Sequence, residues 1–80
     1  MNLEEAREAI VEAILDVAPD TDPSSLADEA AFREELGIDS MDFLDILEQV
    51  ADETGVEVPE KDYPKVQTLA DFSKYLSQEA

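Results

Sequence analysis

The residues of this chain that could carry chemistry lie in one short stretch, GIDSMDFL at positions 37–44. Gly37 can adopt the positive φ that a tight turn needs, and Asp39 is a preferred residue for capping the start of a helix. Ser40 then falls at the first helical position, beside backbone N–H groups without helical partners and at the positive end of the helix dipole. A phosphate attached to the Ser40 hydroxyl would therefore lie where a helix favours negative charge. The alternative interpretation is that Asp39 and Ser40 are only capping residues.

The composition limits the reactions that the chain can perform alone. It contains no cysteine and no histidine, so it has no thiol nucleophile and lacks the commonest general base. Thiol or acid–base chemistry must therefore be supplied by a cofactor or a partner. Asp20, Asp22 and Ser24 are spaced like the start of a calcium-binding loop. Ser25 and Ala31 stand where that loop needs glycine and glutamate, so no specific metal site is expected.

The charge of the chain is strongly one-sided, with 22 acidic and 5 basic residues and a net charge of -17. Such a surface disfavours binding to nucleic acids and to anionic membranes. It favours basic partners, which electrostatic attraction would bring in quickly. The N-terminus has no basic region followed by an apolar run, and no apolar stretch is long enough to cross a bilayer. We therefore expect a soluble, cytoplasmic protein.

Three amphipathic helices are predicted to position the stretch at 37–44. Residues 3–17 and 40–54 place apolar side chains at spacings of three and four, and a last helix begins near Thr68. Gly55 is a natural stop for the second of these helices. The apolar stripes are, in chain order, Leu3, Ala6, Ile10, Ala13, Ile14 and Val17, then Phe43, Ile46, Leu47, Val50 and Ala51, then Leu69, Phe72 and Leu76.

The remaining segments are predicted to be connections. Residues 18–38 form a long first loop that could hold a short helical turn within 27–35, and Leu26, Phe32 and Leu36 would pin it to the core. Residues 60–66 read as one short helical turn. Because the apolar stripes can only be buried against one another, we expect a single all-α domain over residues 1–80. It would be a small four-helix bundle of three main helices and one short helix.

Two large apolar residues fall outside the buried stripe of the helix at 40–54. Met41 lies within its acidic arc, and Leu44 lies at the border between the arcs. Their clustering beside Ser40 predicts a docking surface. The alternative is that they are single exposed apolar residues, which are common on protein surfaces.

The segment GIDSMD at 37–42 resembles the signature of acyl carrier proteins, usually Gly-x-Asp-Ser-Leu/Met-Asp. The resemblance continues through EVP at 57–59, TLAD at 68–71 and YL at 75–76, and it covers nearly the whole chain. The long loop at 18–38 matches least. The resemblance implies an acyl-carrier-type four-helix bundle.

In function, the resemblance implies that Ser40 carries 4'-phosphopantetheine through a phosphodiester. A separate phosphopantetheinyl transferase would install this group from coenzyme A with magnesium. Its terminal thiol would hold acyl intermediates as thioesters and deliver them to partner enzymes of fatty-acid or related lipid biosynthesis. The carrier itself would catalyse nothing and would act as a monomer.

The resemblance also implies how the carrier would bind partner enzymes and where its acyl chain would lie. The helix at 40–54 corresponds to the family's acidic recognition helix, which would contact basic patches on enzymes that activate, transfer or condense acyl groups. The candidate contacts are the acidic residues Asp39, Asp42, Asp45, Glu48 and Asp52 and the apolar residues Met41 and Leu44. An acyl chain would fold back into the bundle, among Phe43, Ile46, Leu47, Val50, Val66 and Leu69.

Some positions depart from the family pattern. Phe43 stands where housekeeping carriers usually have a small polar residue, and Asp45 stands where they usually have glutamate. Pro64 and Lys65 also change the character of the short helix. These departures suggest a specialised, stand-alone carrier. Two alternatives remain: a carrier of aminoacyl or polyketide units, and an unmodified acidic adaptor that binds basic partners through the helix at 40–54.

Overall fold

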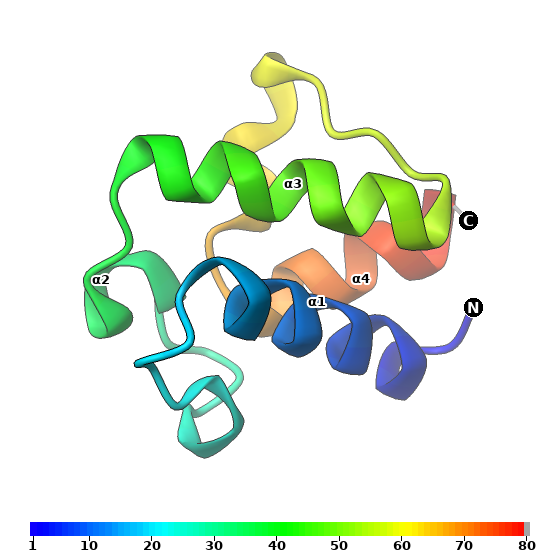
Figure 1. Cartoon of the computed structure of the whole chain (residues 1–80). Helices are drawn as coiled ribbons and strands as arrows, with labels where there is room; N and C mark the ends of the chain where they lie inside the picture. Colours follow the sequence, from blue (N-terminus) through cyan, green and yellow to red (C-terminus); the bar gives the residue numbers. More distant parts are fainter. Residues whose placement is uncertain (80) are drawn as a thin grey trace.

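The computed structural model describes residues 1–79 and confirms the all-α bundle (Figure 1). Within these residues there is no strand, and a single antiparallel bridge joins Ala31 to Thr68. The elements in chain order are α1 (Leu3–Val17), η1 (Pro23–Ser25), α2 (Phe32–Leu36), α3 (Ser40–Thr54), η2 (Glu60–Val66) and α4 (Leu69–Glu79), where η denotes a 3-10 helix.

Local capping explains why the long helices begin where the sequence predicted. Asn2 caps α1: its side chain accepts a hydrogen bond from the Glu5 N–H at 2.8 Å, and the Glu5 carboxylate accepts one from the Asn2 N–H at 3.2 Å. At the start of α4, the Thr68 hydroxyl accepts from the Asp71 N–H at 3.0 Å. Gly55 ends α3 with a φ of 77°, a left-handed conformation that glycine adopts without strain.

Helix α1 packs against α3 and α4, and their apolar faces form one core (Figure 1). Nearly all of the stripe residues expected from the sequence are buried there or packed against it. Leu3 is an exception, since it is 51% exposed. It occupies the first position of α1 and lines a surface depression with Ala70 and Ser73 of α4 instead of entering the core.

The long first loop is tied down at several points. Phe32 is fully buried, and Leu26 and Leu36 pack against the core, as predicted. The Ala70 N–H of α4 donates to the Asp28 carbonyl at 2.9 Å, which fixes the loop to the last helix. The helical turn expected within 27–35 forms slightly later, as α2, and its first residue, Phe32, is buried. None of the helices within residues 1–79 is long and apolar enough to cross a membrane.

Candidate functional site

Ser40 is the first residue of α3, at the end of that helix where α2 leads into it (Figure 1). Gly37 makes the turn before it with a φ of 68°, and the Ile38 N–H donates to the Arg33 carbonyl at 2.8 Å to close α2. Asp39 has extended backbone and caps α3, as the sequence predicted. The turn and the cap together present Ser40 at a fixed, solvent-exposed helix start.

The backbone around Ser40 suits a phosphate ester on its hydroxyl. Among the first N–H groups of α3, that of Asp42 donates to the Asp39 carboxylate at 2.9 Å and that of Phe43 to the Asp39 carbonyl at 2.9 Å. The N–H groups of Ser40 and Met41 lie ahead of these and point out of the helix end. They would be available to a phosphate, and the helix dipole adds to that attraction. An exposed serine hydroxyl at this position is a chemically competent attachment point.

An acidic groove follows α3 away from Ser40, and it brings together four of the predicted recognition residues. Its walls come from α3 and from the C-terminal part of α1, and it is lined by Asp16, Val17, Asp42, Asp45, Glu48, Gln49 and Asp52. Asp16 was not singled out from the sequence, because it lies on a different helix. No group of three or more acidic residues within positions 1–79 is arranged to hold a metal ion. Asp45, Glu48 and Asp52 are exposed and give the groove a negative surface.

The two apolar residues predicted for docking are both exposed. Met41 is 75% exposed and Leu44 is 46% exposed, and both follow Ser40 within the first two turns of α3. Asp39, the remaining recognition candidate, is exposed and uses its side chain as the helix cap. The contacts that these residues make with partners stay a prediction.

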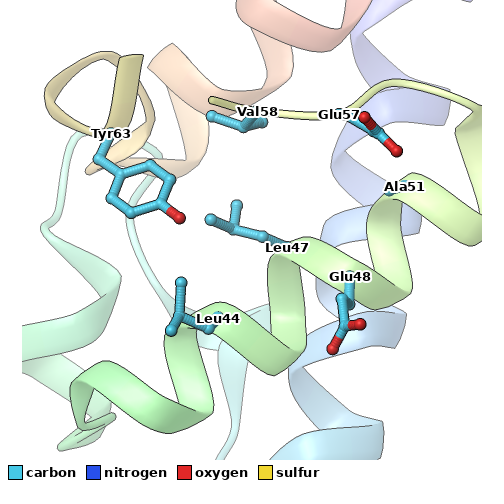
Figure 2. A pocket seen from close by; sticks show the side chains of 7 residues that line it. All are labelled: Leu44, Leu47, Glu48, Ala51, Glu57, Val58 and Tyr63. Carbon is cyan, nitrogen blue, oxygen red and sulfur yellow. The ribbon is translucent and has the colours of Figure 1, made fainter. Parts of the chain in front are cut away.

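A second groove, of about 410 Å³, lies between α3 and residues 57–63 and shares Glu48 with the acidic groove (Figure 2). Figure 2 shows Leu44 and Leu47 of α3 facing Val58 and Tyr63, while Glu48 and Glu57 lie toward the other end, near Ala51. The groove therefore begins one turn from Ser40 with apolar walls, and two glutamates line its other end. Of the residues expected to surround an acyl chain, only Leu47 lines it.

The other residues expected around an acyl chain are packed in the core. Phe43 is 2% exposed, and the rest are fully buried: Ile46, Val50, Val66 and Leu69. The Phe43 ring contacts Phe32 at a centroid distance of 6.1 Å, and the Arg33 guanidinium lies 4.5 Å from its centroid. Sequence reasoning placed Phe43 on the buried stripe but had no signal for its ring partners.

The wall formed by η2 is anchored to α4 by a hydrogen bond. The Tyr75 hydroxyl donates to the Asp62 carboxylate at 2.7 Å. This bond lowers the pKa of Asp62, an effect opposed by partial burial and reinforced by Lys65. The same bond, with burial, raises the pKa of Tyr75 to about 12. Because Asp62 precedes Tyr63 in the chain, this bond holds the wall of the groove in place.

Comparison with known protein families agrees with this geometry. A family model described as a phosphopantetheine attachment site matches residues 8–76. The match begins within α1, ends within α4, and includes Ser40 and both grooves beside α3.

Proposed function

The chain belongs to the phosphopantetheine attachment site family, and from this membership we propose that it is an acyl carrier protein with Ser40 as its attachment residue. The domains of this family carry the 4'-phosphopantetheine prosthetic group. The observation that supports Ser40 is its place as the exposed first residue of α3, with backbone N–H groups at the same helix end. A phosphodiester there gains from the helix dipole.

The prosthetic group supplies the terminal thiol on which an acyl group is held as a thioester, and the chain has no cysteine of its own. The chain's residues then have three tasks. Asp39 fixes the start of α3, Ser40 bears the group, and the acidic face of α3 meets partner enzymes. The chain performs no catalysis in this proposal. The acyl groups would be intermediates of fatty-acid or related lipid biosynthesis.

The partners of this carrier would be a phosphopantetheinyl transferase and enzymes that activate, transfer or condense acyl groups. Each would present a basic docking patch to Asp42, Asp45, Glu48 and Asp52, with Met41 and Leu44 as apolar contacts. A carrier must reach many enzymes and leave each one. Charge-steered contacts with a modest apolar component give fast arrival and weak retention.

The attachment site can be tested by mass. We would incubate the apo protein with coenzyme A, magnesium and a transferase of broad specificity. The protein should gain the mass of one phosphopantetheine group, and Ser40→Ala should gain none. Ser24→Ala provides a matched control, since Ser24 is also an exposed serine in a short helical segment, and it should be modified like the wild type.

Two results would contradict the proposal. Modification that persists in Ser40→Ala would place the attachment elsewhere. An unmodified wild-type protein, with a transferase that modifies other carriers, would favour the acidic adaptor. Loading the modified protein with fatty-acyl or aminoacyl activating enzymes would then distinguish a lipid carrier from a carrier of aminoacyl units.

A further inference from the structure

Two aromatic rings fill the seam between α3 and η2 at the end of the bundle where Ser40 lies. The rings of Phe43 and Tyr63 meet edge to face, with centroids 5.6 Å apart and an interplanar angle of 88°. Phe43 lies one turn along α3 from Ser40. Rings in this arrangement are in contact, so the route from the start of α3 into the core is closed at this level.

Phe43 is held from more than one side. Arg33 of α2 lies over its ring at 4.5 Å, a cation–π contact, and Phe32 of the same helix packs against it at 6.1 Å. Phe32 in turn stacks on Phe72 of α4 at 6.2 Å. Swinging Phe43 aside would break its contacts with α2 and with Tyr63 of η2 in a closely packed interior. The ring is therefore a fixed part of the core.

Tyr63 is held through its backbone and its neighbour. The Gln67 side chain donates to the Tyr63 carbonyl at 2.7 Å, and Asp62 accepts the hydrogen bond from Tyr75 of α4. These contacts fix η2 at both flanks of Tyr63. In Figure 2 the Tyr63 ring extends from η2 toward α3, at the Leu44 end of the groove.

The groove outside these rings offers a different environment from the core behind them. Leu44, Leu47 and Val58 give it apolar walls near Ser40, whereas Glu48 and Glu57 make its far end negative. Both glutamates are exposed. A long alkyl chain lying here would keep much of its surface in water, with a cost that grows with its area. A carboxylated group would be repelled by the two glutamates.

We infer that this carrier holds a short, uncharged acyl group in the groove between α3 and η2, and that Phe43 and Tyr63 exclude the group from the core. This inference rests on the proposed attachment at Ser40. It differs from the fold-back into the bundle that the sequence resemblance implied. It assigns Phe43 and Tyr63 as the residues that limit acyl length.

The test compares acyl groups of different length on the whole protein. Butanoyl and octanoyl groups, joined through an amide to prevent hydrolysis, would be placed on the wild type by a broad transferase from the matching coenzyme A analogues. Denaturant unfolding then gives the equilibrium constant for each form. A chain buried in the core would strengthen folding about fourfold per methylene, or about 250-fold between these lengths. We expect a change below tenfold, and a larger change would overturn the inference.

Variants then test the two rings. Phe43→Leu combined with Tyr63→Ala should open the seam, and its unfolding constant should change more than tenfold between butanoyl and octanoyl forms. Phe72→Leu is the matched control, since it removes a buried ring that contacts Phe32 from α4, and it should respond like the wild type. If the double variant does not fold, the same comparison is made with Tyr63→Ala alone, which removes only a half-buried ring. If the unfolding constant of the double variant is the same for the butanoyl and octanoyl forms, the proposed role of the two rings is refuted.

The inference and the proposed function fail in different ways. If Ser40 is not the attachment residue, mass spectrometry shows no acyl-phosphopantetheine on the wild type. If the attachment is right and the inference is wrong, the mass is present and the wild-type unfolding constant falls steeply as the acyl chain lengthens.

Discussion

Reversing single charges along α3 should slow transferase modification according to their distance from Ser40. Asp45 and Asp52 are both exposed, both line the acidic groove, and lie two helical turns apart on the same face. At 1.5 Å per residue, Asp45 lies about 7.5 Å and Asp52 about 18 Å along the axis from Ser40. An enzyme that reaches the Ser40 hydroxyl must therefore approach Asp45 more closely.

The magnitude follows from the exposure of these carboxylates. An exposed ion pair contributes about 0.2–1 kcal/mol, and reversal replaces that attraction with a repulsion of similar size. Asp45→Lys should therefore raise the barrier by about 0.4–2 kcal/mol, which is about a 2- to 30-fold loss in kcat/KM. Asp52→Lys should cost clearly less, since 18 Å exceeds the Debye length of about 10 Å at 0.1 M salt.

The assay is the initial rate of mass gain at 0.05 M and at 1 M sodium chloride. Glu8→Lys on α1 makes the same change in net charge at an exposed position and should leave the rate near that of the wild type. The difference between Asp45→Lys and Asp52→Lys should shrink at 1 M, where the Debye length is about 3 Å. Equal losses in all three variants would show that only net charge matters, and a larger loss in Asp52→Lys would place the docking site away from Ser40.

Three further predictions concern stability, measured by urea unfolding or thermal melting. Because Tyr75 has a pKa of about 12 in the fold and about 10 when unfolded, the wild type should lose stability as pH rises from 10 to 12, and Tyr75→Phe should not. The lowered pKa of Asp62 acts at the other end, so the wild type should also lose more stability than Tyr75→Phe as pH falls below about 4. The pKa of Glu53 is raised by burial and by the nearby carboxylates Glu12 and Asp16. Mild acid should therefore stabilise the wild type. Glu53→Gln should be more stable than the wild type at pH 7 and should gain less stability from acid. With a net charge of -17, the melting temperature should rise from low salt to 0.5 M sodium chloride, and a flat response would show that charge repulsion does not limit this fold.

The sequence predicted the helices well because their ends are set by neighbouring residues. Asn2 and Asp39 cap through bonds to residues three positions later, and Gly55 stops α3 through its own φ. Such signals need no knowledge of the tertiary structure. The prediction that Leu3 is buried was wrong. Periodicity gives the angle of a side chain about the helix axis, but it does not show whether another element covers that part of the helix.

The site was predictable only where it belongs to one helix. Ser40 and the acidic residues of α3 follow from position and spacing, whereas Asp16 joins the acidic groove from α1 through tertiary packing. The second groove depends on which residues η2 places opposite α3. That arrangement rests on the bond from Tyr75 to Asp62 and on the Gln67 side chain. No local pattern in the sequence reports it.

Phe43 shows why burial alone does not determine how an acyl group would be held. An apolar residue on the inner face of α3 can line a space for an alkyl chain or fill that space, and its position on the helix is the same in both cases. Whether Phe43 lines such a space or fills it depends on the residue that lies opposite its ring. Tyr63 brings a second ring into contact at 5.6 Å, and a smaller side chain at that position would leave the seam unfilled. The pair formed by these two residues, rather than the hydrophobicity of the α3 stripe, therefore sets the acyl length that this fold admits.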